Sequence, residues 1–399
     1  MSSYDALVIG GGLVGCATAN YLAQAGLSVA LIEKGNINQE ASGRNAGSLH
    51  FQIEHRQIHH AQDLDSELQY CVSLAQLAIA SWREIETELE TNVDLAMDGG
   101  LMLAETGEEV SLLEKKAKLE SEQGLNVQLM DGDETRRLAP YLGEHIKGAL
   151  FCPDEGHCNP RLLTPAVARQ AEKNGVTLFT RCHVTDIRRA NKSWRVTAEL
   201  NSNNTNHETM SFEGSIIVNA AGAWAVNVGR MANVHLPIFP VALLINVTEK
   251  VSPLIHHLIQ HVGRKLSMKQ VEDGNVLIGG GWSARLPQQR GDWLSDSAEL
   301  DINAVRGNLQ TATDIAPMIK QLRLLRTWTG TTGVTPDQLP IVGEVSQAPG
   351  FYVAAGGSGF TYGPTYARLL CEMITRGEPS FPLTPYSPDR FSHMNMFMG

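Results

Sequence analysis

The sequence predicts an α/β protein that opens with a dinucleotide-binding strand–helix–strand unit. Three features near the N-terminus predict it: a short aliphatic run, a glycine-rich turn, and a second aliphatic run that ends in an acid. They all fall within SYDALVIGGGLVGCATANYLAQAGLSVALIEK. Because buried parallel strands read as continuous aliphatic runs, we expect ALVI and SVALI to be neighbouring strands of a parallel sheet.

The glycine-rich turn has the spacing G-x-G-x-x-G, formed by Gly10, Gly12 and Gly15. The first glycine permits a tight turn, the second lets a pyrophosphate approach the backbone, and the third lets the next helix pack against the strand. That helix is predicted over CATANYLAQAG, directly after Leu13, Val14 and Gly15, and its N-terminus favours an anion. We therefore expect these five residues to bind the pyrophosphate of a dinucleotide.

The acid that ends the second predicted strand is Glu33, eighteen residues after Gly15. An acid at this position binds ribose hydroxyls and disfavours a 2′-phosphate, so NADP is disfavoured. We expect Glu33 and the adjacent Lys34 to contact the adenosine half of the ligand. FAD and NAD both carry that half, so both stay open on these residues alone.

Composition narrows the class of protein. A chain of 399 residues is long enough for two domains, and a net charge of −11 argues against nucleic acid as a partner. No apolar run approaches the ~20 residues that span a bilayer, and the N-terminus lacks the basic region of a signal peptide, so we expect neither.

The cysteines predict a reducing environment and no metal. Six of them are spread over the chain without a disulfide pattern, which fits the cytoplasm. Cys152, His157 and Cys158 lie close together in FCPDEGHCNP, but their spacing is not that of a zinc knuckle. We therefore expect structural thiols there.

The loop after the second strand, NQEASGRNAGSLHFQ, is rich in hydrogen-bond donors and has no hydrophobic period. It resembles the segment by which FAD-dependent amine oxidoreductases of the D-amino-acid oxidase (DAO) family lead the chain to the flavin. The resemblance implies that FAD-binding residues in this loop are Ser42, Arg44, Asn45, Ala46, Gly47, Ser48 and Leu49.

The resemblance recurs in the family's order along nearly the whole chain. DGGLMLAET resembles the first strand of that family's substrate domain, and the stretch from DEGHCNPRLL to HVTDIRR resembles the returning helix and strand of its flavin domain, with Val184 at an adenine contact. SIIVNAAGAWA resembles the turn that closes over the cofactor, and GFYVAAGGSGFTYGPTYARLL the C-terminal flavin-binding segment. The cofactor residues implied are Ala220, Ala221, Gly222, Trp224, Gly330, Gly357, Ser358, Gly359, Phe360 and Thr361.

These blocks favour FAD over NAD, because a nicotinamide dehydrogenase does not need the chain to return to a glycine-rich turn at its end. We expect non-covalent FAD, since the stretch before TPD contains no cysteine. The resemblance implies a Rossmann-like FAD-binding domain, residues 1–85, 148–232 and 325–399, interleaved with an α+β substrate-binding domain, residues 86–147 and 233–324, which has a mostly antiparallel sheet. Within the latter, EEVSLLEKKAKLESEQG is expected to be a helix with a solvated, charged face.

The activity implied is oxidation of a C–N bond next to a carboxylate: hydride passes from the α-carbon to flavin N5, and water hydrolyses the imine. Candidate substrate-facing residues are His50, Gln52 and Arg56, which follow the flavin loop. Amino-acid oxidases of the family often carry an arginine where WTGTTGVTPD has Thr332, which argues against a plain D-amino-acid dehydrogenase or glycine oxidase. Lys265 and Lys269 are weaker candidates for holding the substrate carboxylate, and we expect them to be surface charges instead.

Within the family, the flavin loop, the missing arginine and the ending FPLTPYSPDRF most resemble the β (B) subunits of bacterial opine oxidases or dehydrogenases. This implies oxidative cleavage of octopine or nopaline by the catalytic subunit of a cytoplasmic hetero-oligomer. Its α subunit and small electron-transfer subunit would hold FMN and an iron–sulfur cluster. Two alternatives stay open: a sarcosine, proline, hydroxyproline or D-amino-acid oxidase or dehydrogenase, and a non-catalytic FAD-binding scaffold.

Overall fold

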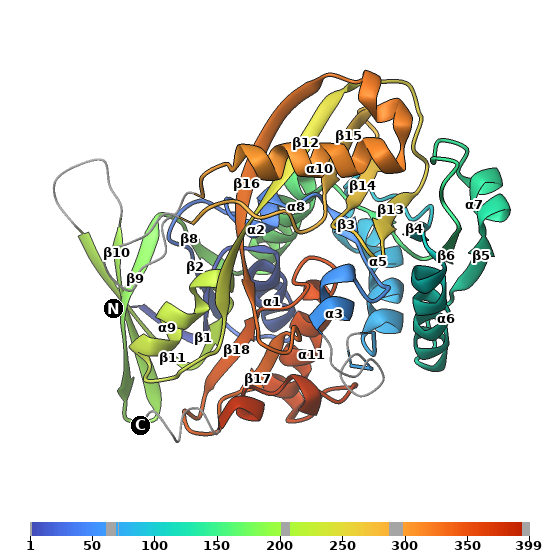
Figure 1. Cartoon of the computed structure of the whole chain (residues 1–399). Helices are drawn as coiled ribbons and strands as arrows, with labels where there is room; N and C mark the ends of the chain where they lie inside the picture. The colour runs from blue at the N-terminus through green and yellow to red at the C-terminus, as the bar shows by residue number, and fades with distance from the viewer. Residues whose placement is uncertain (1, 61–68, 71, 201–207, 287–297, 393–399) are drawn as a thin grey trace.

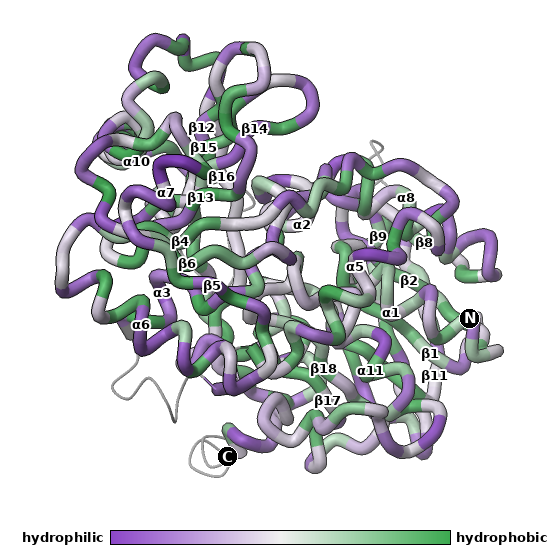
Figure 2. The backbone as a smooth tube through the Cα atoms, turned by 90° about the vertical axis from the view of Figure 1, so that its right-hand side faces the viewer, coloured by the Kyte–Doolittle hydropathy of each residue, from purple (hydrophilic) through white to green (hydrophobic). Residues whose placement is uncertain are grey.

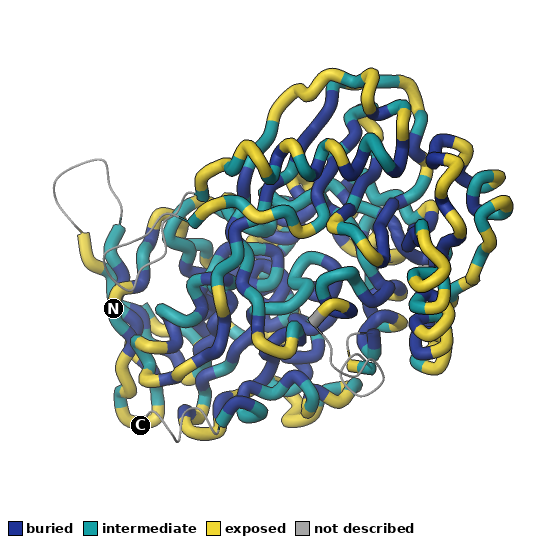
Figure 3. Tube along the Cα trace, in the orientation of Figure 1, coloured by how far each residue is buried: buried dark blue, intermediate teal, exposed yellow. Residues whose placement is uncertain are grey.

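A computed structural model describes residues 2–60, 69–70, 72–200, 208–286 and 298–392. Within these residues the strands form two eight-stranded sheets and one two-stranded ribbon. Figure 1 shows the first sheet in the left and lower part of the molecule and the second in its upper right part. The hydrophobic colour in Figure 2 follows the strands of the first sheet, and Figure 3 shows the strands of both sheets as largely buried.

The first sheet has the order β17-β18-β11-β1-β2-β8, with β10 paired to β11 and β9 paired to β10. The five strands from β18 to β8 are parallel, so their carboxyl ends meet at one edge. Its strands are β1 (Ser2–Ile9), β2 (Val29–Ile32), β8 (Thr177–Phe179), β9 (Cys182–Ala190), β10 (Ser193–Leu200), β11 (Glu208–Asn219), β17 (Ile341–Glu344) and β18 (Phe351–Ala355).

The N-terminal unit forms as predicted. The second half of β1, Ala6 to Ile9, is buried, and the chain then turns at Gly10 with a φ of +115°. Helix α1 (Leu13–Gln24) follows and packs against α8 (Pro160–Lys173) and α11 (Gly363–Arg376). A Cβ on Gly15 would lie 1.9 Å from the carbonyl oxygen of Gly10, so only glycine allows α1 to approach β1 this closely.

The second sheet has the order β16-β12-β15-β14-β13-β4-β6-β5 and is antiparallel except for the parallel pair β13 and β4. Helix α10 (Ile302–Ile315) lies across it in Figure 1. Its strands are β4 (Gly100–Ala104), β5 (Gln128–Asp131), β6 (Gly148–Cys152), β12 (Phe239–Lys250), β13 (Leu258–His261), β14 (Ser267–Gln270), β15 (Asn275–Gly279) and β16 (Leu324–Val334).

Short elements connect the two sheets. The ribbon pairs β3 with β7, so that Ser48 lies opposite His157. The remaining elements are α2 (Ala41–Arg44), β3 (Ser48–Leu49), α3 (His55–His60), α5 (Ala75–Leu89), α6 (Gly107–Glu122), α7 (Gly132–Leu138), β7 (Gly156–His157), α9 (Ala225–Met231) and the 3-10 turns η1 (Gly222–Trp224), η2 (Pro317–Gln321), η3 (Thr384–Tyr386) and η4 (Pro388–Phe391).

The predicted α/β class and the mostly antiparallel second sheet are confirmed. The domain boundaries stay a prediction, but strands at two of them pair differently from our assignment. β6 and β16 fall in segments assigned to the FAD-binding domain, residues 148–232 and 325–399, yet both pair within the second sheet. The local sequence pattern of a strand does not show which of two sheets it pairs with where the chain passes from one domain to the other.

Helix α6 differs from its predicted character. Its outer side is exposed in Figure 3, as expected for a charged helix. Its inner side carries Lys116 and Glu120, whose side chains are 2% and 0% exposed and form an ion pair of 2.8 Å. The prediction of a solvated charged face was therefore wrong for these two residues. No helix in the described ranges combines the length and the apolar character needed to cross a bilayer.

Candidate active site

A cavity of about 1280 Å³ lies between the two sheets. One wall is formed by the carboxyl ends of the parallel strands β1, β2 and β18, and the other by β12, β14 and β16. Ligands of open α/β sheets bind at this edge of the parallel strands, because the chain turns away there and leaves a crevice. The segments predicted to bind a dinucleotide therefore converge on one large cavity.

The end of the cavity next to α1 is a backbone cradle. The Glu33 carboxylate accepts hydrogen bonds from the backbone N–H groups of Gly11 (2.6 Å) and Gly35 (2.7 Å), and Ser42 Oγ accepts one from Leu13 N (2.9 Å). Gly12 is the N-cap residue of α1, and no side chain caps the helix there. The positive end of the helix therefore faces the cavity. A Cβ on Gly12 would lie 2.9 Å from Ser42 Oγ. This cradle fits a pyrophosphate.

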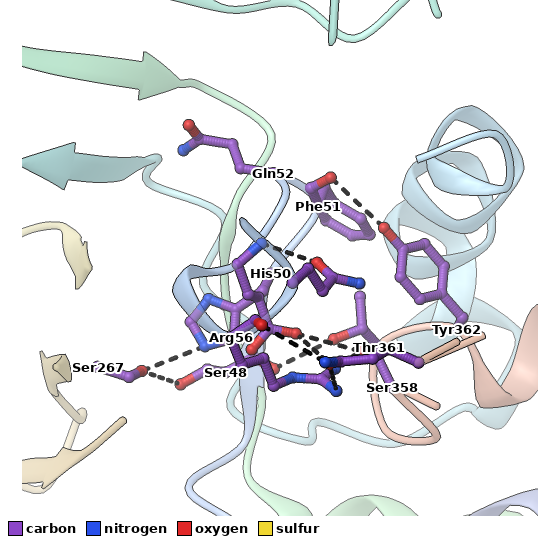
Figure 4. Close-up of polar contacts among 12 residues, drawn as sticks. Ser48, His50, Phe51, Gln52, Arg56, Ser267, Ser358, Thr361 and Tyr362 are labelled. Atoms are coloured by element: carbon purple, nitrogen blue, oxygen red, sulfur yellow. Dashed lines mark hydrogen bonds and ion pairs between the residues drawn. The ribbon is translucent and has the colours of Figure 1, made fainter. Parts of the chain in front are cut away.

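His50 lies in the wall of the same cavity, just after β3 (Figure 4). Its Nε2 is 3.2 Å from Ser267 Oγ, while its buried Nδ1 has no hydrogen-bond partner among the described residues. Burial lowers the pKa of His50 to about 4, with Lys269 and Arg56 acting in the same direction against Glu54. The imidazole is therefore neutral at pH 7, and its Nδ1 keeps an unused hydrogen-bonding capacity behind the cavity wall.

Arg56 on α3 joins the N-terminal loop to the C-terminal glycine turn. Its guanidinium donates to Glu54 Oε1 (3.1 Å), Gln338 Oε1 (2.9 Å) and Ser358 Oγ (2.9 Å), as Figure 4 shows in part. Burial alone would raise the pKa of Glu54, but Arg56, His50 and Ser358 lower it to about 2. Arg56 thus lines the cavity with its charge already balanced by the partly buried carboxylate of Glu54.

The model of the FAD-dependent oxidoreductase family, DAO, matches residues 5–373. The chain belongs to this family. Its resemblance to the DAO family, which the motifs predicted, is thereby confirmed, and the cofactor is FAD.

Several relatives and solved structures are similar over most of the chain. Sarcosine dehydrogenase of Homo sapiens is 26% identical over 98% of this chain, which spans 42% of that protein. Glycine oxidase of Geobacillus kaustophilus is 28% identical over 97% of both chains. Its crystal structure matches with a TM-score of 0.82 at 25% identity over 98% of this chain and 99% of that one. L-proline dehydrogenase from P. horikoshii has the same fold, with a TM-score of 0.83 at 24% identity over 98% and 99% of the two chains. The chain thus spans less than half of some curated relatives and nearly all of others.

Most of the residues predicted to bind FAD do line the cavity. These are Gly10, Gly12, Val14, Glu33, Lys34, Ser42, Arg44, Asn45, Ala46, Ser48, Val184, Ala220, Ala221, Gly222, Trp224, Gly330, Gly357, Ser358, Gly359, Phe360 and Thr361. Their individual contacts to FAD stay predictions.

Four predicted FAD-binding residues do not line the cavity. Leu13 and Leu49 are fully buried in the core, where their side chains pack between elements. Gly15 gives α1 its close approach to β1, and a Cβ on Gly47 would lie 1.9 Å from the carbonyl oxygen of Cys158. These four residues shape the FAD-binding loops from behind.

Gln52 was predicted to face the substrate, and this was wrong. Its side chain is 2% exposed and turns away from His50 in Figure 4. Its Nε2 donates to Glu155 Oε2 and its Oε1 accepts from Lys116 Nζ, each over 2.9 Å. A buried amide needs such partners, and the charged residues behind the loop supply them.

The sequence reasoning missed Ser267 on β14 and ranked Lys269, on the same strand, only as a weaker candidate. Ser267 contacts His50, and Lys269 Nζ lies 2.6 Å from Ser48 Oγ with a side chain that is 1% exposed. Lys269 was expected to be a surface charge; instead, burial lowers its pKa to about 7. The alternation Ser-Met-Lys-Gln could have indicated that Ser267 and Lys269 share one strand face. Lys265 is exposed but also lines the cavity, as does Thr332.

Two groups of metal-type ligands have other roles among the described residues. Cys158 Sγ is buried and donates to the carbonyl oxygen of Val93. Glu105 and His261 lie near Glu109, but Arg264 already pairs with Glu105. His261 Nδ1 accepts two backbone N–H bonds, which leaves the proton on Nε2, an atom 3.2 Å from a carboxylate oxygen of Glu105. A neutral imidazole in this tautomer offers a metal no lone pair.

Proposed function

We propose that this protein oxidises the C–N bond of an amine that carries a carboxylate, preferably a secondary amino acid. The observation that supports the proposal is His50, a neutral imidazole in the wall of the cavity that also holds the FAD cradle, whose buried Nδ1 has no hydrogen-bond partner among the described residues. An amine substrate must lose its proton before oxidation. A neutral imidazole at the reacting end of the cavity would accept that proton or its hydrogen bond.

The chain's own residues would bind and orient the substrate. Bound FAD supplies the chemistry that accepts a hydride from the carbon next to nitrogen. His50 Nδ1 would accept a hydrogen bond from the amine N–H. The two sheets on either side of the cavity would keep water away from the bound amine, and this desolvation lowers the pKa of the amine. Two cations line the cavity wall: Arg56, which follows His50 in the chain, and Lys265, which precedes Ser267. Either would attract the carboxylate of the substrate.

The names of the relatives support small amino acids: sarcosine, glycine and proline. Octopine and nopaline remain our proposal for a larger substrate of the same class, because both contain a secondary amine between carboxylate-bearing arms. The chain is also similar to an anaerobic glycerol-3-phosphate dehydrogenase subunit of Escherichia coli, whose named substrate is not an amine. The test must therefore separate amines from alcohols.

We would mix the FAD-loaded protein anaerobically with sarcosine, glycine, L-proline, octopine, nopaline, D-alanine and glycerol 3-phosphate, and follow the flavin absorbance. The proposal expects bleaching by at least one secondary amino acid and none by glycerol 3-phosphate. His50→Asn should keep FAD and slow bleaching by about 10²–10⁴-fold, the usual contribution of one acid–base group. Bleaching by glycerol 3-phosphate alone would overturn the amine proposal, and a yellow protein that no compound bleaches would point to a scaffold.

We further propose that the chain acts in a cytoplasmic hetero-oligomer with an α subunit and a small electron-transfer subunit. FMN and an iron–sulfur cluster would reside in or next to those partners. Purification of the tagged chain from its native cells, with the flavin and iron of the eluate measured, tests this. Recovery of the chain alone, with FAD and rapid peroxide formation in air, would favour a self-sufficient oxidase.

A further inference from the structure

A buried lysine stands between the FAD cavity and a second cavity. Lys269 lines this second cavity, which has a volume of about 560 Å³ and also borders His157, His257 and Gln270. The ribbon of β3 and β7 separates the two spaces, with Ser48 lining the FAD cavity and His157 opposite it lining the second. The Lys269 side chain reaches Ser48 Oγ over 2.6 Å, so it bridges the wall.

From Ser48 the contacts continue to the candidate base. Ser48 Oγ lies 3.4 Å from Ser267 Oγ, and Ser267 Oγ lies 3.2 Å from His50 Nε2, as Figure 4 shows. A serine hydroxyl can donate one proton and accept another, and an imidazole can take a proton on one nitrogen while it releases one from the other. The four side chains therefore form an unbroken series of exchangeable protons from His50 Nδ1 to Lys269 Nζ.

We propose that His50, Ser267, Ser48 and Lys269 form a proton path that carries the amine proton of the substrate out of the FAD cavity and into the second cavity. This inference rests on the proposed function, because it needs an amine substrate next to His50. The ammonium N–H bond breaks as His50 Nδ1–H forms, and Nε2–H passes to Ser267. Ser267 passes its own proton to Ser48, Ser48 passes one to the neutral amine of Lys269, and Lys269 releases one to water. No electrons are transferred in these steps.

The charges around the path suit proton transfer at neutral pH. Burial lowers the pKa of Lys269 to about 7, opposed only by Cys158, so charged and neutral amine coexist. Across the ribbon, burial and Lys269 together lower the pKa of His157 to about 3, so that imidazole stays neutral beside it. At the other end, Glu54 and Arg56 offset each other around His50. A lysine with an ordinary pKa would stay charged and could not accept the proton.

A structural role for Lys269, which would only hold Ser48 in place, predicts different kinetics. Lys269→Arg tests the difference, because arginine can still donate to Ser48 but does not titrate. Lys269→Met removes the group, and Lys118→Met removes an exposed lysine on α6 as a control. The assay is anaerobic reduction of bound FAD by sarcosine, or by L-proline if sarcosine is inert, from pH 5.5 to 9 in H₂O and D₂O.

The proposal expects the wild type and Lys118→Met to show a rate that rises through pH ~7 and falls in D₂O. Lys269→Met and Lys269→Arg should both lose this pH dependence and the solvent isotope effect, with a rate at least about tenfold lower. If both variants keep the wild-type pH profile and isotope effect, the path is wrong although the amine oxidation stands. If the wild type reduces FAD with no amine, the proposed function fails, and the path fails with it.

A second measurement does not depend on activity. With ¹³Cε-labelled lysine, the resonance that disappears in Lys269→Met should titrate near pH 7 in both the FAD-loaded and the FAD-free protein. Ser48→Ala should shift that titration while leaving the other lysine resonances in place. A resonance that titrates only above pH 9 would show a permanently charged lysine and overturn the path.

Discussion

The side chain of Gln52 donates a hydrogen bond of 2.9 Å to Glu155 Oε2, and this contact holds the segment between His50 and Arg56 from behind. The other carboxylate oxygen, Glu155 Oε1, accepts the backbone N–H groups of Phe51 (2.8 Å) and Gln52 (2.9 Å). Glu155 is fully buried, so these donors have no water to replace it. The geometry of His50 in the cavity therefore depends on a carboxylate that does not itself line the cavity.

The first prediction concerns Glu155→Gln and pH. Burial raises the pKa of Glu155 to about 7 against the hydrogen bonds of Gln52, compared with 4.5 when unfolded. Between these values the folded state keeps a proton that the unfolded state has lost, so this group's contribution to stability falls as pH rises. The difference between these two pKa values corresponds to about 3 kcal/mol at most. Urea unfolding from pH 4.5 to 7.5 should show that the free energy of unfolding of the wild type falls relative to that of Glu155→Gln as pH rises. A difference between the two that does not change with pH would contradict this.

The second prediction concerns the buried ion pair behind the same loop. Lys116 Nζ contacts Gln52 Oε1 and Glu120, and Glu120 Oε1 accepts the backbone N–H of Ile53 (2.6 Å). Burial raises the pKa of Glu120 while Lys116 opposes the rise. Lys116→Met alone should cost about 3–5 kcal/mol, because it leaves a buried carboxylate unpaired.

The double variant Lys116→Met/Glu120→Gln removes both charges and should recover part of this loss. Urea unfolding of the two single variants and the double variant completes the cycle. The exposed pair of Lys118 and Glu122, four residues apart on the same helix, is the matched control and should cost less than about 1 kcal/mol. Equal losses for the buried and exposed lysines would contradict the prediction.

The sequence was informative where the chemistry is local. The spacing of Gly10, Gly12 and Gly15 predicted the cradle and the helix after it, because turn, helix start and close packing are all determined within a few residues. It was less informative where a partner lies far away in the chain. Lys269 is 221 residues from Ser48, and Gln52 is 103 residues from Glu155, so nothing near either residue indicates that it is buried.

The third prediction separates two glycines of the cradle. Gly12→Val should fold, because the backbone at this position is extended and the nearest atom to a new Cβ is the movable Ser42 Oγ. It should lose FAD, because the side chain fills the space of the pyrophosphate. Gly15→Ala should instead destabilise the fold, since its Cβ would meet the backbone oxygen of Gly10 at 1.9 Å.

The ratio of flavin to protein absorbance and the thermal unfolding of the apoprotein distinguish the two glycine variants. Gly26→Ala provides a control, because a Cβ there meets no atom within 4 Å, although its φ of +91° adds strain. A yellow Gly12→Val protein would place the pyrophosphate elsewhere in the cavity.

The fourth prediction separates the two cations that the substrate carboxylate could reach. Lys265 is an exposed residue of the cavity wall, so Lys265→Met should raise KM by about 10- to 100-fold, the loss of one hydrogen bond to a charged group, with kcat nearly unchanged. Arg56→Met should act differently, because it takes the cation away from the partly buried Glu54 and removes the guanidinium contact to Ser358, and it should lower FAD retention and stability together. Lys250→Met, on the exposed pair with Asp273, is the control for charge alone.

Steady-state kinetics with the amino acid that bleaches the flavin, and flavin content after gel filtration, provide the two readouts. An unchanged KM in Lys265→Met would show that this lysine does not bind the substrate carboxylate. A cation in contact with a carboxylate attracts it at short distance, so its loss would weaken substrate binding.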